Sequence, residues 1–117
     1  MANPHRGEVE IILAGEKFTL LPSFEACVEI EQKTGTGIYH YARRCLNDNF
    51  GLKDAEIIFA AGIRAKGEHK VPPNLANMIF ENGITTSITP SLIFLGFLVG
   101  GNNSSKEEAT SGEAKAA

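Results

Sequence analysis

The fold is decided by residues 7–44, which read GEVEIILAGEKFTLLPSFEACVEIEQKTGTGIYHYARR. This stretch divides into a segment of alternating apolar and polar residues, an acidic segment after Pro22-Ser23, a break at Gly35 and Gly37, and a basic segment. The alternation predicts a β-hairpin, and the two segments after it have the spacing of helices. Glycine at the break is typical of a helix end. We therefore expect a hairpin followed by two helices, the first capped by Ser23.

The hairpin pattern also predicts which strand residues face each other. A two-residue loop at Gly15-Glu16 would pair Leu13 with Phe18 and Ile11 with Leu20. That pairing places the apolar side chains on one face, as half-buried antiparallel strands require. Two strands alone are only marginally stable in water, so the hairpin must pack on helices or gain another strand.

The helical spacing predicts which side of each early helix faces the core. In the first helix we expect Phe24, Cys27 and Val28 to lie along the inward stripe. In the second helix, roughly residues 38–47, we expect Leu46 to face inward and Arg44 to face solvent. Further helices are expected at three places in the remaining sequence: residues 53–66, residues 72–83 and residues 85–99.

The whole chain of 117 residues is expected to form one domain. Residues 7–100 predict an α+β fold in which the N-terminal hairpin packs on a bundle of four to five helices. Residues 101–117 contain no large apolar side chain, so we expect a disordered C-terminal tail there.

Composition excludes some partners. The formal net charge is −3, from 14 acidic and 11 basic residues, whereas nucleic-acid binding needs a clustered excess of Lys and Arg. The single basic pair, Arg43-Arg44, is interpreted as a solvated helix face. The longest apolar run, residues 92–99, is much shorter than the roughly 20 residues of a membrane-spanning helix. We therefore expect neither nucleic acid nor a membrane as a partner.

The sequence offers no convincing catalytic, metal or cofactor site. Cys27, His40 and Cys45 lack a fourth metal ligand, and helical spacing puts His40 opposite Cys45. The segment Gly35-Thr36-Gly37 lies between two helices and does not follow a strand, so it is not a dinucleotide fingerprint. Two cysteines in a chain of this size are typical of reduced, buried thiols in a cytosolic protein. We expect a protein that is not an enzyme and has no cofactor.

The last helix is the main candidate for a binding surface. Residues 92–99 are apolar around the whole helix, which implies burial on all sides. Two interpretations remain open: a central core helix, or a helix with one face left for a partner or a second copy. The exposed edge of the hairpin is a second candidate, because it can accept an added strand. The candidate partner-binding residues are Ile93, Phe94, Phe97, Leu98, Ile12 and Leu21.

A set of segments occurs along the chain in a particular order and spacing: residues 6–15, residues 18–24, Glu29-Ile30-Glu31, Gly35, Gly37, Ile38, Ala42-Arg43-Arg44, residues 58–66 and Asn82-Gly83-Ile84. In this order and spacing, the segments resemble the gene transfer agent family of small phage-type proteins. The resemblance covers residues 6–101. Its motifs are structural rather than chemical, and the family offers no catalytic residues to transfer.

This resemblance implies a tail assembly chaperone of a long-tailed phage, a prophage or a gene transfer agent. Such a chaperone keeps the apolar helices of the tape-measure protein soluble in the cytoplasm of the bacterial host until the tail tube forms. It would bind the tape-measure protein or another tail protein, and homo-oligomers are possible. Two alternatives stay open: a structural component associated with the tail tube, and a small regulatory adaptor that binds other proteins.

Overall fold

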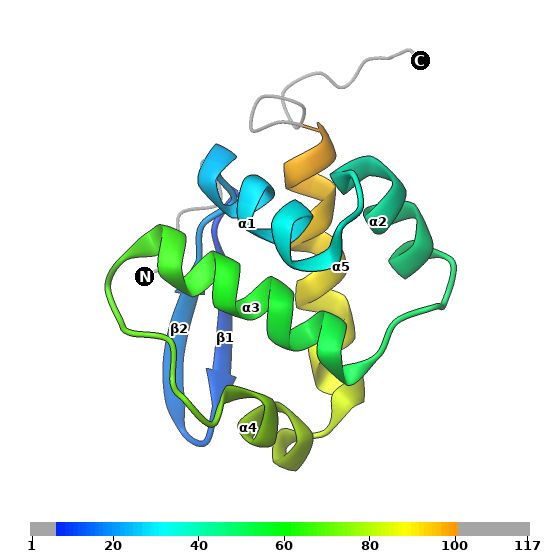
Figure 1. Cartoon of the computed structure of the whole chain (residues 1–117). Helices are drawn as coiled ribbons and strands as arrows, with labels where there is room; N and C mark the ends of the chain where they lie inside the picture. The colour runs from blue at the N-terminus through cyan, green and yellow to red at the C-terminus, as the bar shows by residue number, and fades with distance from the viewer. Residues whose placement is uncertain (1–6, 101–117) are drawn as a thin grey trace.

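The computed structural model describes residues 7–100, and residues 1–6 and 101–117 lie outside this part. The predicted disordered tail falls on the second of these segments, so it lies outside the described residues. The chain begins with β1 (Val9–Leu13) and β2 (Glu16–Leu20), which form a two-stranded antiparallel sheet. The predicted hairpin is thus confirmed (Figure 1).

The hairpin loop lies one residue earlier than predicted. Ala14 and Gly15 form the loop with φ angles of 52° and 78°, and Leu13 pairs with Glu16. Positive φ at both positions is the geometry of a type I′ turn, which matches the right-handed twist of the strands. Ile11 therefore pairs with Phe18, and the predicted pairing of Ile11 with Leu20 is wrong. The apolar residues still share one face, because both strands kept their alternation.

Five helices follow the hairpin, which confirms the predicted α+β fold. Their bounds are α1 (Phe24–Thr34), α2 (Ile38–Leu46), α3 (Leu52–Lys66), α4 (Leu75–Asn82) and α5 (Ile84–Gly100). Ser23 caps α1, as expected, by accepting a hydrogen bond from the N–H of Ala26 at 3.1 Å. α3 begins without a capping Ser or Thr, and Asp54 instead accepts from the N–H of Gly51 at 2.8 Å.

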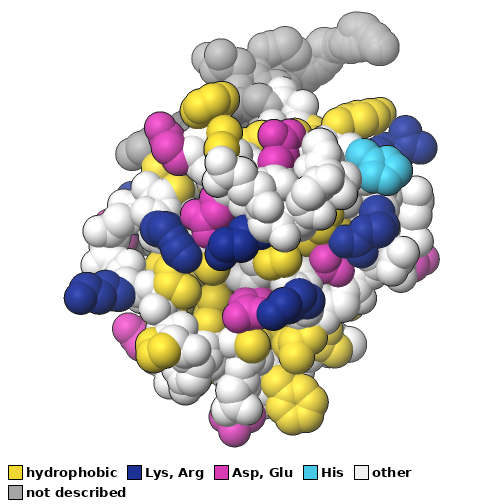
Figure 2. All heavy atoms as spheres, in the orientation of Figure 1, with side chains coloured by type: hydrophobic (Ala, Val, Ile, Leu, Met, Phe, Trp, Pro, Cys, Tyr) yellow, Lys and Arg dark blue, Asp and Glu magenta, His cyan; other side chains and the backbone are white. Residues whose placement is uncertain are grey.

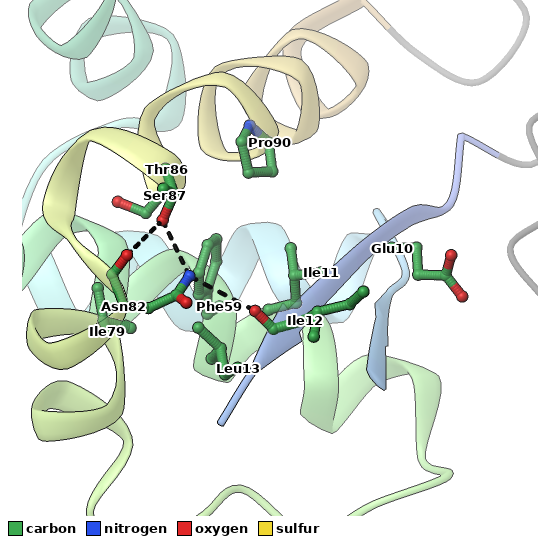
Figure 3. A pocket seen from close by; sticks show the side chains of 10 residues that line it. All are labelled: Glu10, Ile11, Ile12, Leu13, Phe59, Ile79, Asn82, Thr86, Ser87 and Pro90. Carbon is green, nitrogen blue, oxygen red and sulfur yellow. Dashed lines mark hydrogen bonds between the residues drawn. The ribbon is translucent and has the colours of Figure 1, made fainter. Parts of the chain in front are cut away.

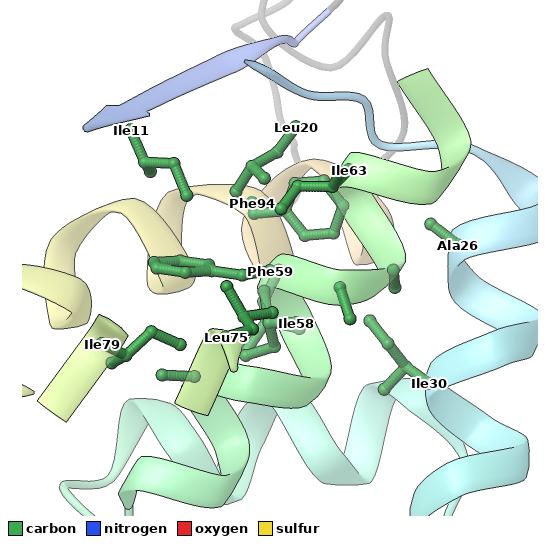
Figure 4. Packing of buried hydrophobic residues seen from close by; sticks show 14 of the residues in the cluster. Ile11, Leu20, Ala26, Ile30, Ile58, Phe59, Ile63, Leu75, Ile79 and Phe94 are labelled. Atoms are coloured by element: carbon green, nitrogen blue, oxygen red, sulfur yellow. The ribbon is translucent and has the colours of Figure 1, made fainter. Parts of the chain in front are cut away.

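The third helix is the central element of the fold. α3 contacts β2, α1, α4 and α5, and Figure 1 shows it lying across the hairpin and α5. Its buried side chains Ile58, Phe59 and Ile63 form the middle of the core (Figure 4). Gly62 lets α3 approach β2 closely, because a β-carbon built there would lie 2.6 Å from Cβ of Leu20. Core packing therefore holds the hairpin directly on α3.

The predicted faces of α1 and α2 are wrong at individual residues. In α1, Phe24 is 78% exposed and the residues that face the core are Ala26 and Ile30. Alanine at this position allows α1 to pack closely on α3, and that contact sets the rotation of the helix. In α2, Leu46 is 51% exposed although it was expected to face inward. Arg44, which was expected in solvent, instead turns inward to Asp54 at 2.9 Å.

Candidate functional site

Two of the residues expected to bind a partner face the inside of the molecule. Phe94 is 0% exposed and lies among core side chains of α3 and the hairpin (Figure 4). Leu98, one turn further along α5, is partly buried and packs against the same core. The expectation that Phe94 belongs to an exposed docking face is therefore wrong. The side of α5 that carries Phe94 faces α3. Residues 92–99 contain no polar side chain that would mark the opposite side as the exposed one, so the sequence did not reveal this orientation.

Other candidate residues gather along the border between β1 and α5. On α5, Pro90, Ile93 and Phe97 are spaced three or four positions apart, so they lie on one side of the helix. At one end, Pro90 lines a groove together with Ile12. At the other end, Cγ of Phe97 lies only 2.9 Å from a β-carbon built on Gly7. We call this set the β1–α5 seam and define it by four residues: Ile12, Pro90, Ile93 and Phe97.

The β1–α5 seam is partly open to solvent. Ile12 is 54% exposed and Ile93 is 47% exposed, while Phe97 and Pro90 are partly buried. Leu21, the last predicted residue, lies apart from the seam at the end of β2. Its side chain is partly buried, and its N–H donates to the carbonyl of Gly62 at 3.1 Å, which ties it to α3. Of the six predicted residues, the structure thus places Ile12 in the groove wall and Phe97 beside Gly7, and Ile93 lies between Pro90 and Phe97 on one side of α5.

A groove of about 250 Å³ opens at the Ile12 end of the seam. Figure 3 shows its wall formed by β1 on one side and by the start of α5 on the other. Phe59 and Ile79 contribute apolar surface, and Glu10 contributes a carboxylate. The carboxamide of Asn82 donates to Oγ1 of Thr86 at 2.9 Å and, over 3.5 Å, to the carbonyl of Ile12. A groove of this size is suited to an apolar side chain together with a short piece of backbone.

The backbone of β1 adds polar groups to this border. Leu13 and Glu16 flank a two-residue loop, so they form a hydrogen-bonded pair, and pairs alternate along the ladder. The N–H and C=O groups of Glu10 and Ile12 therefore point away from β2. They form the outer edge of a two-stranded sheet, where Asn82 donates to one of them, the carbonyl of Ile12, over 3.5 Å. An outer strand edge is the kind of edge that can accept an added strand.

The last helix carries no charged side chain along its whole length. Its sequence, ITTSITPSLIFLGFLVG, places the hydroxyls of Ser87 and Ser91 on the buried side. Ser87 donates to the carbonyl of Ile84 at 2.6 Å, whereas Oγ of Ser91 has no hydrogen-bond partner among residues 7–100. The outward side of α5 includes Thr85, Thr89 and Ile93. It is exposed and carries no charge, so no charged group would have to lose its hydration if an apolar surface packed there. Such a face is suited to contact with another protein.

The described part of the chain holds no group of three His, Cys, Asp or Glu side chains able to bind a metal ion. Burial raises the pKa of the Cys27 thiol, with a further contribution from Glu31, and burial also raises the pKa of Cys45. Both thiols are therefore protonated near neutral pH and poor nucleophiles. Within residues 7–100, no single helix is long and apolar enough to cross a bilayer, but α4 and α5, bent by 114°, pass that test as a pair.

Sequence reasoning missed a polar cluster that joins α2 to α3. Asp54 accepts hydrogen bonds from the Tyr41 hydroxyl at 2.7 Å and from Arg44 at 2.9 Å. Burial alone would raise the pKa of Asp54, but hydrogen bonds from Arg44, Tyr41 and Gly51 outweigh it and lower the pKa below its usual value. Burial and the bond to Asp54 raise the pKa of Tyr41. The only sequence signal was a carboxylate in the first turn of α3, and it did not name its partners.

A small α+β domain with an outer strand edge and an uncharged, partly exposed helix face is of the class that associates with other proteins. The chain belongs to the family described as phage tail tube protein, GTA-gp10, whose family model matches residues 6–101. The resemblance to gene transfer agent proteins noted from the sequence is thus confirmed. No curated protein and no solved structure matches the chain.

Proposed function

We propose that this protein is a non-enzymatic assembly chaperone for the tail of a phage, prophage or gene transfer agent. In this role it binds apolar helices of the tape-measure protein in the cytoplasm of the bacterial host, before the tail tube forms. Membership of a phage tail family supports a role in tail assembly. The further step, from tail protein to chaperone, is supported by the partly open β1–α5 seam.

The single observation that carries the proposal is the exposure of two apolar side chains: Ile12, which lines the groove, and Ile93, which lies three residues after the groove residue Pro90 on α5. Complete burial of an isoleucine side chain contributes roughly 1.5–3 kcal/mol, so the exposed half of each residue offers about 1 kcal/mol to a partner. An apolar partner helix lying along the seam would cover both side chains and place one of its own in the groove. Contacts of this size allow reversible binding, which a chaperone needs.

Coexpression with the neighbouring tape-measure gene product tests the proposal. We expect the two proteins to co-purify, and the tape-measure protein to remain soluble only when the chaperone is present. The double variant Ile12→Ser, Ile93→Ser should weaken binding by roughly tenfold or more, because it removes about 2 kcal/mol of contact. Binding should be measured on the purified pair by calorimetry or by pull-down at graded concentrations.

Leu46→Ser is the matched control for this experiment. Leu46 is an aliphatic residue with 51% exposure, close to the 47% of Ile93, but it is the last residue of α2 and lines neither the groove nor the seam. We expect this variant to retain its affinity within about twofold. Two proteins that stay separate on coexpression, or an equal loss of affinity in both variants, would contradict the proposal.

A structural component associated with the tail tube is a second candidate, and the family, described as one of tail tube proteins, favours it. A tube component remains in the finished particle, where its exposed surfaces join other tail proteins or further copies of itself. A chaperone leaves before the particle is complete. Mass spectrometry of purified mature particles separates the two: stoichiometric amounts of this protein there favour the structural role.

A further inference from the structure

A cationic surface lies on α2, outside the β1–α5 seam. We call it the α2 cationic face and define it by five residues: Tyr39, His40, Arg43, Arg44 and Asn47. These residues line a shallow hollow of about 400 Å³. In Figure 2, dark-blue and cyan side chains gather at the upper right, over α2. The five residues include two guanidinium groups and an imidazole but no carboxylate, and the carboxylate of Asp54 binds one of the two guanidinium groups, that of Arg44. The whole chain, in contrast, has a net charge of −3.

Arg43 and Arg44 are neighbours in sequence but differ in their contacts. Arg44 is bound to Asp54 at 2.9 Å and to the carbonyl of Asn49 at 2.8 Å, and its guanidinium lies 5.0 Å from the ring of Tyr41. It therefore joins α2 to α3. Arg43 makes no ion pair with any acidic side chain among residues 7–100. Its charge remains available to a partner.

Tyr39 holds Arg43 in a defined position. The guanidinium carbon of Arg43 lies 5.8 Å from the centre of the Tyr39 ring, and Nη1 donates to the Tyr39 hydroxyl at 3.3 Å. Tyr39 itself is 63% exposed, so the pair contributes little to the core. Tyrosine and arginine are the residue types most enriched where binding energy is concentrated in protein interfaces. To the extent that the contact with Tyr39 restricts the Arg43 side chain, it lowers the entropy that binding a partner costs.

The helix dipole does not account for this arrangement. Cations near the C-terminal end of a helix are stabilised when they lie close to the last carbonyl groups. Arg43 instead reaches back one turn, toward Tyr39, and away from those carbonyls. Helical side chains tilt toward the N-terminus, so Arg43 meets Tyr39 one turn back, and the contacts with the Tyr39 ring and hydroxyl then hold its charge away from the last carbonyls.

We propose that the α2 cationic face binds an acidic segment of a partner protein, whose carboxylates pair with Arg43 while its apolar groups contact the Tyr39 ring. Guanidinium groups bind carboxylates through two parallel hydrogen bonds, which gives the contact a defined geometry. Nucleic acid fits less well, because a chain of net charge −3 repels a polyanion except at this small face. The proposal does not depend on the chaperone role, because the face is separate from the seam.

Fluorescence anisotropy with defined synthetic peptides tests this proposal on the full-length protein. The probe is a fluorescein-labelled twelve-residue peptide of Glu, Leu and Ala, and its control has every Glu replaced by Gln. We expect the Glu peptide to bind at least about tenfold more tightly, and addition of salt to reduce its affinity. Arg43→Ala should weaken binding by roughly tenfold, and Arg43→Lys by less, because lysine keeps the charge but not the bidentate fork.

Lys70→Ala is the matched control, since it removes an exposed cation that lies in the linker between α3 and α4. Lys70→Ala should change the affinity for the Glu peptide by less than about twofold, because it changes only the net charge and not the α2 cationic face. Unchanged circular dichroism and melting temperature of Arg43→Ala, together with its loss of binding, would assign the effect to the face. Equal effects of Arg43→Ala and Lys70→Ala would overturn the proposal, and so would tighter binding of a single-stranded DNA of the same charge. The seam variant Ile12→Ser, Ile93→Ser should bind the Glu peptide normally, which separates this test from that of the chaperone role.

Discussion

Two serines one turn apart on α5 show how much a single hydroxyl depends on its partner. Ser87 donates to the carbonyl of Ile84, whereas Ser91 is fully buried and its Oγ has no hydrogen-bond partner among residues 7–100. A buried hydroxyl without a partner costs about 1–3 kcal/mol. The two positions therefore form a natural comparison within one helix.

We expect Ser91→Ala to stabilise the protein by about 1 kcal/mol and Ser87→Ala to stabilise it less or to destabilise it. Both variants gain the same small helix propensity of alanine, so the difference between them reports the hydroxyl alone. The free energy of unfolding, measured by urea denaturation, checks this. Equal changes at the two positions would contradict it.

Asp54 makes the stability depend on pH in the acid range. Its pKa is lowered in the folded protein, so its contribution is present above the pKa of about 3.9 that the unfolded chain has, and it is lost as the pH falls further. We expect Asp54→Asn to lower the free energy of unfolding by about 1–3 kcal/mol at pH 7. Below pH 4, the variant should lose less stability than the wild type as the pH falls.

Asp48→Asn is the control for this measurement. Asp48 is exposed and has a φ of 67°, a conformation that asparagine also adopts, so the backbone should accept the change. Urea denaturation at pH 7, 5 and 3 should give parallel curves for the control and the wild type. If Asp54→Asn also runs parallel to them, the cluster with Arg44 and Tyr41 does not stabilise the fold through its charge.

At the scale of elements, the contact between α3 and β2 depends on one glycine. A β-carbon at Gly62 would lie 2.6 Å from Cβ of Leu20 and 3.1 Å from its Cα, so the strand would have to move. We expect Gly62→Ala to destabilise the protein by about 1–3 kcal/mol, because overpacking outweighs the gain in helix propensity.

Gly96→Ala is the control for this substitution, and we expect it to raise the stability instead of lowering it. Gly96 lies within α5, is exposed, and has no atom within 4 Å of a built β-carbon. Alanine there should stabilise the helix by about 0.5–1 kcal/mol. Thermal unfolding of both variants checks the pair. A stabilised Gly62→Ala would mean that β2 can shift away from α3 without loss of packing.

The sequence predicted elements better than it predicted which residues lie between them. The alternation of apolar and polar residues correctly predicted the apolar face of the hairpin. Ser23 and Gly35 correctly marked the two ends of α1. The predicted loop was one residue too late, because alanine rarely adopts a positive φ and Ala14 therefore gave no sign of being a loop residue. Helix faces failed where tertiary contacts decided the rotation, as at Phe24 and Leu46.

The candidate site was predictable only in part, for a related reason. Ile93 and Phe94 are adjacent and both apolar, so their spacing does not tell which of them α3 covers. The groove needs residues from β1, α4 and α5 at once, and no local pattern brings these together. Arg44 and Asp54 lie ten residues apart on different helices, so helical spacing could not pair them.

At the scale of the whole molecule, one ion pair connects distant parts of the chain. The carboxylate of Glu8, only 1% exposed, lies 3.0 Å from the ammonium group of Lys66 at the end of α3. A carboxylate is costly to bury before a cation is at hand. The hairpin also packs on α3 at Gly62, so on the ribosome the first strand has no surface to dock on until α3 has been synthesised, and the newborn hairpin stays undocked during that interval. The order of translation and the order of docking are thus opposed at this strand.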